Sequence, residues 1–463
     1  MQSGVMGYME GLTLSDVIES TRGHWTGRNE PSAIVPTGVS IDTRTLKPGE
    51  IFFALPGEKV DGHQFLDAAF DRGACAAVVI RSGARESRQA LIAVDAPDLA
   101  LGDLARFYRR RFDIPVIGIT GSSGKTTTKD MVAAVLSTRY RVLATQGNLN
   151  NRLGVPLTLF KLSAHCDVAV IEMGISERGG LRYLCEIAQP TIGMITNIGP
   201  AHIEFFGSVE GVAKAKGELL EYLDESSMTI LNLDDLFLSK ERAKVKGRLL
   251  GIGIEQICQF RGEGLKLDQK GFGHFSLQGH SFHLSIPGKH NVYNALMAAT
   301  AGWALDVPLQ DAAKALENFT LTKLRSQVLE HNGIRMINDT YNANPASMRA
   351  ALETLSQIEV DGRRIAVVGD MRELGAMTYD AHRELGREVG NRQIDALFAL
   401  GDLAPVVVEG GREAGIDQAW AYADRDALTG ALQTYLKPGD LMLIKGSRSI
   451  AMERIVTALG FEM

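Results

Sequence analysis

The sequence predicts an α/β fold divided into three domains, and three observations lead to this prediction. The chain has 463 residues, which is room for three domains at the usual size of roughly 150 residues each. Short apolar runs alternate with helical stretches along most of the chain, and in its last third these runs end in Gly- and Asp-rich turns. Such alternation favours parallel sheets. We therefore expect domains over residues 1–113, 114–322 and 323–463.

Composition and charge narrow the class of protein. Hydrophobic residues make up 45% of the chain and charged residues 22%, which is typical of a soluble globular protein. The 49 Lys and Arg residues against 55 Asp and Glu give a formal charge of -6, so no overall basic field attracts nucleic acid or anionic membranes. The four cysteines form no CxxC pair, which disfavours a zinc site and a disulfide framework. Neither a signal segment nor a long apolar run is visible, and we expect a cytoplasmic protein without membrane insertion.

In the first domain, strands are predicted where the sequence has continuous apolar runs. These runs lie at residues 51–55, 75–80 and 91–94, and a helical stretch occupies residues 63–74. The pattern indicates a small α/β unit.

In the second domain, the apolar strand at 115–120 leads into a glycine loop and then a helix over 126–140. Further strands are predicted at 167–173 and 191–199. Short alternating segments over 265–287 predict a small antiparallel excursion, and a helix over 291–305 follows it. The third domain repeats the alternation with predicted strands at 333–339, 364–370, 396–402 and 441–447.

The stretch TGSSGKTTTKDM, residues 120–131, is the clearest candidate for a binding site. A strict P-loop has glycine five residues before Gly124, where this chain has Ile119. The glycines nevertheless let backbone N–H groups turn toward phosphate oxygens, and Lys125 adds a cation. Thr126 offers a hydroxyl to Mg²⁺, and the following helix offers its positive end. The stretch predicts nucleotide binding, against the alternative of a plain glycine turn between a strand and a helix.

Three other polar residues lie at or after predicted strands of the second domain. Glu172 ends the run VAVIE at the sheet edge where ligands of parallel sheets bind, so it is a candidate magnesium ligand, or else a helix cap or a solvated turn residue. His202 follows the strand at 191–199, and Lys216 lies in the helical stretch VEGVAKAKGELL. A lone histidine is usually structural and a lysine on a helix is usually a solvated charge, so these two residues by themselves do not indicate a site.

The third domain has two polar turns that directly follow strands. NDTYNANP contains Asp339 and Tyr341 and follows Arg325 at the domain entrance. It could hydrogen-bond a ribose, a base or a peptide, or it could be an Asx-rich turn that ends at Pro345. KGSRS, residues 445–449, is compatible with anion binding and with helix capping.

Taken together, these motifs resemble the Mur ligases, ATP-dependent amide-forming enzymes of bacterial cell-wall synthesis. The resemblance covers nearly the whole chain and rests on DTRTLKPGEIFFALPGEKVDGHQF, GITGSSGKTTTK, TQGNLNNRLGVP, EMG, NIGPAHIEFFGS, AKAKGE, GKHNVYNA, NDTYNANPASM and KGSRS. Within the family, GSSGKT, DTYNANP and KGSRS are most similar to the members that add D-alanyl-D-alanine to UDP-N-acetylmuramoyl-tripeptide. A DNPR-like motif, which marks the sister enzyme that adds a diamino acid, is absent from the sequence. The short glycine loop is the form that the family uses.

The resemblance implies a role for each candidate residue. It implies a P-loop-type central ATPase domain, a C-terminal Rossmann-like ligase domain and a small N-terminal domain for the UDP substrate. The implied catalytic residues are Lys125, His202, Lys216 and Arg325. The implied ATP-binding residues are Thr120, Gly121, Ser122, Ser123, Gly124, Lys125, Thr126, Thr127, Asn291, Asn294, Arg325 and Asp339. The implied substrate-binding residues are Thr43, Arg44, Asn148, Asn150, Tyr341, Asn342, Asn344, Lys445, Ser447 and Arg448. The implied magnesium ligands are Thr126, Glu172, His202 and a carbamylated Lys216.

The implied reaction is the formation of an amide through an acyl phosphate. The tripeptide carboxylate attacks the γ-phosphate of ATP with Mg²⁺ as cofactor, and the amine of D-alanyl-D-alanine then displaces phosphate. The product, UDP-N-acetylmuramoyl-pentapeptide, is a precursor of peptidoglycan, and a monomeric enzyme is expected. The alternatives are a folylpolyglutamate-synthase-like ligase, against which the N-terminal DTRTLKPGEIFFAL argues, and a P-loop ATPase switch without ligase activity. The third residue of the tripeptide, lysine or diaminopimelate, stays open.

Overall fold

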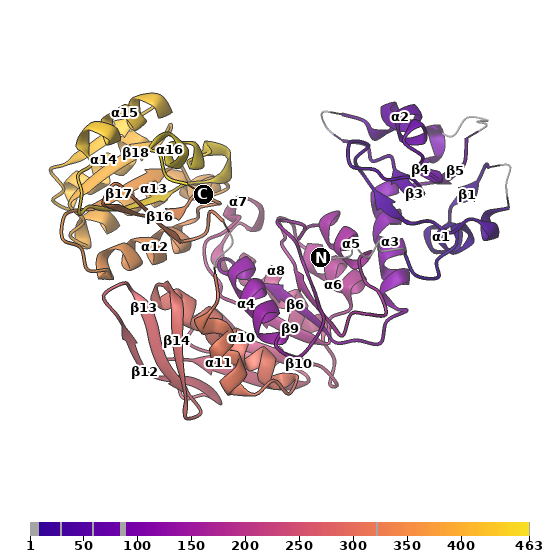
Figure 1. Ribbon diagram of the computed structural model, residues 1–463, viewed down its shortest axis with the longest axis horizontal. Coiled ribbons are helices and arrows are strands. Elements are labelled where there is room, and N and C mark those ends of the chain that lie inside the picture. The colour runs from indigo at the N-terminus through magenta and orange to yellow at the C-terminus, as the bar shows by residue number, and fades with distance from the viewer. Residues whose placement is uncertain (1–8, 28–29, 58–59, 84–88, 321–322, 463) are drawn as a thin grey trace. The chain divides into compact units, whose positions relative to one another are not determined.

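The computed structural model describes residues 9–27, 30–57, 60–83, 89–320 and 323–462 (Figure 1). These residues contain three sheets flanked by helices, which confirms the predicted α/β class. They cluster into two compact units. The first comprises the chain up to residue 118 with 140–175 and 179–193, and the second comprises 119–139, 176–178 and everything from 194 onward. The predicted boundary after residue 322 falls at 321–322, outside the described residues.

The first unit contains a five-stranded sheet in the order β1-β5-β4-β3-β2. The predicted apolar runs are its three middle strands, and their residues are mostly buried because both faces of the sheet are covered. Strands β2 to β5 are parallel, and β1 is antiparallel to β5. The elements are α1 (Leu14–Thr21), β1 (His24–Trp25), β2 (Gly38–Ser40), β3 (Glu50–Phe53), α2 (Leu66–Asp71), β4 (Ala76–Ile80), β5 (Leu91–Val94) and α3 (Pro97–Arg109).

The middle of the chain contributes a nine-stranded sheet in the order β14-β13-β12-β11-β10-β9-β6-β8-β7. Its strands are β6 (Val116–Thr120), β7 (Val142–Ala144), β8 (Val168–Glu172), β9 (Ile192–Ile195), β10 (Met228–Asn232), β11 (Arg248–Gly253), β12 (Phe260–Leu267), β13 (Phe272–Leu277) and β14 (His280–Pro287). Strands β12, β13 and β14 pair antiparallel, which confirms the predicted excursion. The helices are α4 (Lys125–Leu136), α5 (Gly154–Leu159), α6 (Gly180–Ala188), α7 (Ile203–Phe206), α8 (Val209–Tyr222), α9 (Leu236–Glu241), α10 (Lys289–Ala304) and α11 (Leu309–Glu317).

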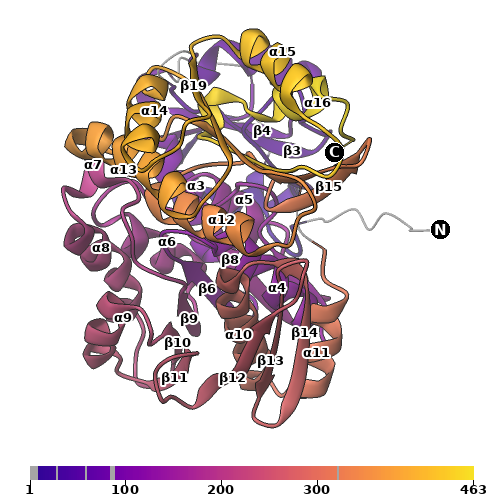
Figure 2. The same cartoon turned by 90° about the vertical axis from the view of Figure 1, so that its left-hand side faces the viewer.

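The last part of the chain, orange to yellow in Figure 2, forms a six-stranded sheet. Its strand order is β15-β16-β20-β17-β18-β19, and it is parallel except for the edge strand β15. Its strands are β15 (Gln327–His331), β16 (Ile334–Asp339), β17 (Arg364–Gly369), β18 (Ala396–Leu400), β19 (Ala419–Tyr422) and β20 (Leu441–Lys445). Its helices are α12 (Pro345–Gln357), α13 (Thr378–Asn391), α14 (Ala404–Glu413), α15 (Arg425–Tyr435) and α16 (Glu453–Ala458). The four strands predicted here are confirmed.

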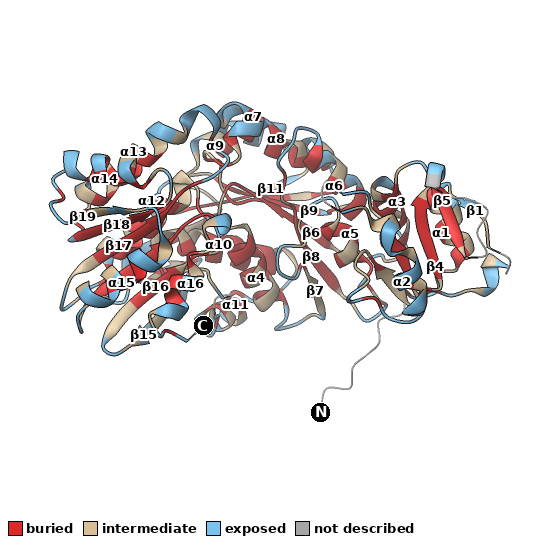
Figure 3. Cartoon of the chain, turned by 90° about the horizontal axis from the view of Figure 1, so that it is seen from above, coloured by how far each residue is buried: buried red, intermediate tan, exposed pale blue. Residues whose placement is uncertain are grey.

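Side chains of this last sheet alternate between two apolar cores. Ala366 and Val368 of β17 pack with α12 and α13, whereas Ile365 and Val367 pack with α15 and α16. Since successive strand residues point to opposite faces, a continuous apolar run is what a sheet covered on both faces requires. Figure 3 shows these strands as buried.

Two further findings concern the helices and cysteines. Of the helices in the described ranges, none combines the length and the apolar character that crossing a membrane requires. The four cysteines, all within the described ranges, are free thiols.

Candidate active site

The glycine loop connects β6 to α4, and its two glycines are demanded by close packing. Gly121 has a φ of 149° and Gly124 a φ of 75°, both in the region that favours glycine. A Cβ on Gly121 would lie 1.8 Å from Oγ1 of Thr196, and one on Gly124 would lie 2.8 Å from Oδ1 of Asn294. Ile119, where a longer P-loop has glycine, is a fully buried residue of β6. The short loop is therefore a complete strand-to-helix turn.

The end of β9 holds the backbone of this loop in place. The Ser122 N–H donates to the carbonyl of Asn197 (3.0 Å), and the Ser123 N–H donates to Oδ1 of Asn197 (3.0 Å). The hydroxyl of Thr196 donates to the Ser123 carbonyl (2.6 Å). These bonds fix the shape of the loop, and they also engage the N–H groups of Ser122 and Ser123. Sequence reasoning missed Thr196 and Asn197, although both belong to the strand end that precedes His202.

Lys125 places its cation directly on the loop. It is the first residue of α4, and its Nζ donates to the carbonyl of Gly121 (2.8 Å). Thr126 follows it and is buried. The positive N-terminal end of α4, the lysine and the two glycines therefore lie within one turn, which is an arrangement suited to phosphate.

Asn291 and Asn294, predicted to lie on the adenine side, connect α10 to the loop helix. Oδ1 of Asn294 accepts from the hydroxyl of Thr128 (3.1 Å), and its Nδ2 donates to Oδ1 of Asn291 (2.9 Å). Asn291 in turn donates to the carbonyl of Pro287 (2.7 Å). The structure thus brings both amides next to the glycine loop, where they fix α10 against α4. Their contact with adenine stays a prediction.

Lys216 is a buried lysine with an unusual environment. It lies in α8 with 1% of its surface exposed, and within the described ranges its ammonium has no hydrogen bond or ion pair. Burial, with a further contribution from the charge of Lys125, lowers the pKa of Lys216 well below its ordinary value. The alternative of a solvated lysine is therefore wrong. A neutral amine is favoured here, and a neutral amine is a nucleophile.

His202 meets a carboxylate from a distant part of the chain. Its Nδ1 lies 2.5 Å from Oε2 of Glu373, and the N–H of Glu204 donates to the Glu373 carbonyl (3.2 Å). The hydrogen bond from His202 lowers the pKa of Glu373. Both partners have left-handed backbone, with φ of 57° at His202 and 63° at Glu373. Such strain concentrates at functional sites. Glu373 was not predicted, and its only sequence signal was a polar turn after the strand at 364–370.

Glu172 is the last residue of β8, within the first unit, and it is 1% exposed. Its Oε1 accepts from Nδ2 of Asn150 (2.7 Å), and the Asn150 carbonyl accepts from the N–H of Gly174 (2.8 Å). Asn148 is exposed, and its carbonyl accepts from the Asn150 N–H (2.7 Å). The alternative of a solvated turn residue is wrong for Glu172, which is a positioned, buried carboxylate.

The donor chemistry of the predicted magnesium ligands suits Mg²⁺. Across the described ranges, no three His, Cys, Asp or Glu side chains gather into a metal site. Mg²⁺, however, prefers one or two protein oxygens together with waters and substrate phosphates, rather than a cage built by the protein. The buried hydroxyl of Thr126 and the buried carboxylate of Glu172 are ligands of this kind.

In the last sheet, the predicted polar residues come together at the ends of β16 and β20. The parallel register places Asp339 beside Lys445, and Nζ of Lys445 lies 2.5 Å from Oδ2 of Asp339. Lys445 also donates to the Asn342 carbonyl (2.8 Å). The Arg325 guanidinium lies 3.9 Å from the ring centre of Tyr341, a cation–π distance. All five residues were predicted to bind ATP or substrate. Four of them, Asp339, Tyr341, Asn342 and Lys445, were predicted from the polar turns at these strand ends, and Arg325 was predicted from the entrance of the domain.

The other polar turn residues have internal partners. Asn344 caps α12 through the Ser347 N–H (2.9 Å), and its Nδ2 lies 3.4 Å from the Ser122 carbonyl of the glycine loop. Ser447 accepts from the Arg372 N–H (2.9 Å). Arg448 pairs with Glu453 (3.0 Å). Asn344 thus caps the helix that begins at Pro345, in line with the alternative of an Asx-rich turn, and its amide also faces the loop.

The predicted UDP-binding residues lie in the first unit, after β2. Arg44 is highly exposed, and its guanidinium pairs with Asp42 (2.6 Å). Hydrogen bonds from Arg44 lower the pKa of Asp42 to about 2. Thr43 is half-buried between them. An exposed guanidinium next to a turn is accessible to a phosphate group.

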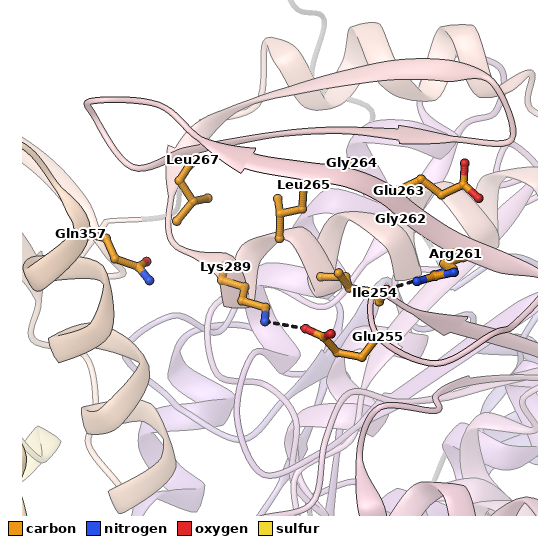
Figure 4. A pocket seen from close by; sticks show the side chains of 10 residues that line it. All are labelled: Ile254, Glu255, Arg261, Gly262, Glu263, Gly264, Leu265, Leu267, Lys289 and Gln357. Carbon is orange, nitrogen blue, oxygen red and sulfur yellow. Dashed lines mark hydrogen bonds and ion pairs between the residues drawn. The ribbon is translucent and has the colours of Figure 1, made fainter.

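A pocket of about 600 Å³ opens beside the start of α10 (Figure 4). Lys289 pairs with Glu255 across it (2.9 Å), and Arg261 donates to the Ile254 carbonyl (3.1 Å). Both cations therefore have partners inside the pocket, which reduces its attraction for an anion. Of the described residues that line it, none was predicted as a site residue.

Comparisons with known proteins cover all three sheets. Three protein-family models match the chain. The model described as "Mur ligase family, catalytic domain" matches residues 36–109, the model of the "Mur ligase middle domain" matches 119–302, and the model of the "Mur ligase, glutamate ligase domain" matches 324–448. The UDP-N-acetylmuramoyl-tripeptide--D-alanyl-D-alanine ligase of Bacillus subtilis is 36% identical, covering 96% of this chain and 98% of that protein. The ligase of the same name from Escherichia coli is 35% identical, covering 97% and 99%.

Solved structures of related proteins superpose over most of the chain. A crystal structure of MurF from Acinetobacter baumannii matches with a TM-score of 0.90 at 32% identity, covering 96% of this chain and 98% of that one. A MurF ligase from Thermotoga maritima in complex with ADP matches with a TM-score of 0.82 at 27% identity, covering 91% and 96%.

Proposed function

The chain belongs to the Mur ligase family, and we propose that it joins D-alanyl-D-alanine to UDP-N-acetylmuramoyl-tripeptide while cleaving ATP to ADP and phosphate. The observation that carries this proposal is the near-full-length similarity to ligases of that one activity, from Bacillus subtilis and Escherichia coli. The preorganised phosphate loop and the buried amine of Lys216 supply the chemistry that such a ligase needs. The product is UDP-N-acetylmuramoyl-pentapeptide for peptidoglycan synthesis.

The first step brings two anions together, the tripeptide carboxylate and the γ-phosphate of ATP. Lys125 and the positive N-terminal end of α4 would offset this repulsion, since both lie at the glycine loop. Arg325 and Asp339 would hold the ribose and phosphates from the last sheet, and Asn291 and Asn294 the adenine side. An acyl phosphate is the resulting intermediate.

Mg²⁺ would be held by Thr126, Glu172, His202 and a carbamylated Lys216. When bound, the ion would neutralise the charge that develops on the transferring phosphoryl group. The carbamate follows from the neutral amine of Lys216, because such an amine adds carbon dioxide and releases a proton. Carbamylation thus converts the buried amine of Lys216 into a buried anion that can ligate a metal.

The second step is attack of the dipeptide amine on the acyl phosphate, with release of phosphate. We assign the binding of the peptide parts of the two substrates to polar turns. One turn follows β7 and contains Asn148 and Asn150. The others lie at the ends of β16 and β20 and contain Tyr341, Asn342, Asn344, Lys445, Ser447 and Arg448. Thr43 and Arg44 would receive the uridine diphosphate. Water must be kept from the acyl phosphate during this step, and closure of the domains over the reactants is a means of excluding it.

We propose in addition that the domains divide after residues 113 and 322, and that the enzyme acts as a monomer in the cytoplasm. Light scattering of the full chain at micromolar concentration checks the monomer, for which the mass is 50.2 kDa.

The decisive experiment is the substrate dependence of phosphate release. We expect release from ATP only when a UDP-N-acetylmuramoyl-tripeptide and D-alanyl-D-alanine are both present. ATP turnover that is indifferent to both would favour an ATPase switch. Turnover with a folate and glutamate in their place would favour the folylpolyglutamate-type ligase.

A further inference from the structure

A second, smaller pocket lies in the second unit. Its volume is about 240 Å³, and its apolar wall is formed by Pro200, Pro345, Met348, Met371, Ala381 and Leu385. Met348, Met371 and Leu385 are buried members of the core beneath α12 and α13. The pocket is therefore a hollow in a packed surface, and its walls are not loose loops.

Three segments connect this pocket to the reaction site. Pro200 follows Gly199, whose N–H donates to the Ser122 hydroxyl of the loop (2.9 Å). Pro345 follows Asn344, whose amide faces the Ser122 carbonyl. Met371 lies two residues before Glu373, the partner of His202. Each wall is thus within two residues of a group that contacts the loop or His202. Figure 2 shows α7, which follows His202, close to α13.

The rim of the pocket is negatively charged. Helix α13 contributes Asp380, Glu384 and Glu388, which are spaced four residues apart and so lie on one face. Glu388 is neutralised by Arg349 (2.9 Å). Glu384 has only a long contact with Arg387 (3.6 Å), and Asp380 has no ion pair among the residues that the structure describes. Two exposed carboxylates therefore remain to attract a cation.

We propose that this pocket receives the side chain of the third residue of the tripeptide, an aliphatic chain that ends in an ammonium group. This inference rests on the proposed function. The reacting carboxylate belongs to that third residue, so its side chain branches from the carbon beside the reaction centre. The apolar wall suits the methylene groups, and Asp380 and Glu384 suit the ammonium.

The rim excludes the other substrate groups. The phosphates of ATP and the carboxylate of D-alanyl-D-alanine are anions, which Asp380 and Glu384 repel. The side chain of lysine ends in an ammonium alone and fits this chemistry, whereas that of diaminopimelate also ends in a carboxylate, which the rim would repel, so the pocket favours the lysine tripeptide.

The test compares three tripeptide substrates, with lysine, diaminopimelate or norleucine as third residue. Norleucine keeps the aliphatic chain but lacks the ammonium. We expect the KM of the better ammonium substrate to lie about fivefold below that of the norleucine substrate, as expected for partly exposed ion pairs. The double variant Asp380→Asn/Glu384→Gln should raise the KM of the ammonium substrate about fivefold and leave those of ATP and norleucine substrate unchanged.

Two further variants separate the pocket from general effects. Asp426→Asn removes an exposed carboxylate from α15, which packs on the other face of the sheet, and should leave every KM unchanged. Ala381→Leu fills the pocket and should raise the KM of all three tripeptides, including norleucine, by about tenfold, because it removes space for the methylene groups.

The outcomes are distinguishable. Equal use of the norleucine and ammonium substrates, with no effect of the double variant, overturns the pocket assignment while the ligase function stands. A raised KM for ATP in the double variant also overturns it, because the pocket would then serve the nucleotide. Absence of phosphate release with every tripeptide overturns the proposed function itself.

Discussion

Two buried lysines of this chain have opposite surroundings. Lys445 ends β20 with 3% of its side chain exposed, and it has both an ion pair with Asp339 and a hydrogen bond to the Asn342 carbonyl. Lys216 in α8 is 1% exposed and has neither kind of partner within the described ranges. A buried charge is stable only when it is paired, and Asp339 provides that partner for Lys445 as part of the fold. Burial without a partner lowers the pKa of Lys216 instead, which favours its neutral, reactive form.

The largest expected effect is the loss of ligation in Lys216→Ala. We expect product formation to fall by about 1000-fold, because an essential metal ligand would be missing. A short-chain carboxylate added to the assay should restore part of the activity, since it would replace the carbamate. The matched control is Lys214→Ala, which removes an exposed lysine from the same helix. Full activity of Lys216→Ala would remove the metal-bridging role.

The second effect is the loss of stability in Lys445→Met. This variant leaves the Asp339 carboxylate, which is mostly buried, without its cation. Breaking a buried pair in this way typically costs about 3 kcal/mol of unfolding free energy. Urea unfolding of the full chain measures it. The double variant Lys445→Met/Asp339→Asn should recover part of the loss, and a single variant as stable as the wild type would show that the pair is not a structural one.

The smallest effect is a difference in the pH dependence of stability. Because burial lowers the pKa of Lys216 below 10.5, the unfolded chain binds a proton at this residue that the folded chain does not. Unfolding free energy therefore rises with pH between the folded pKa and 10.5. The variant Lys216→Met lacks this contribution, so its stability relative to the wild type should fall by about 1 kcal/mol per pH unit over that window. Parallel curves for both proteins would mean that Lys216 is charged.

The sequence predicted the parts of the site that follow local rules. The glycine loop, the strand ends at Glu172 and Asp339, and the antiparallel excursion all come from patterns within a short stretch. The pairing of Asp339 with Lys445 was also within reach, because parallel strands end at the same sheet edge. What the sequence alone left open was burial, since the pattern around Lys216 is equally compatible with a solvated helix face.

Long-range partners could not be predicted. Glu373 reaches His202 from a turn far along the chain, where Gly375 packs against Glu204 and the Glu204 N–H donates to the Glu373 carbonyl. The same holds for Asn294, whose amide closes over Gly124. Such contacts depend on how the sheets are connected in space, and no local pattern encodes them.

The carbamate on Lys216 can be observed directly. Carbon-13 NMR of the full chain, equilibrated with ¹³C-labelled bicarbonate, should show a carbamate resonance in the wild type and in Lys214→Ala, and none in Lys216→Ala. An active wild type without this resonance, or a resonance that persists in Lys216→Ala, would contradict the assignment of Lys216 as the reactive lysine.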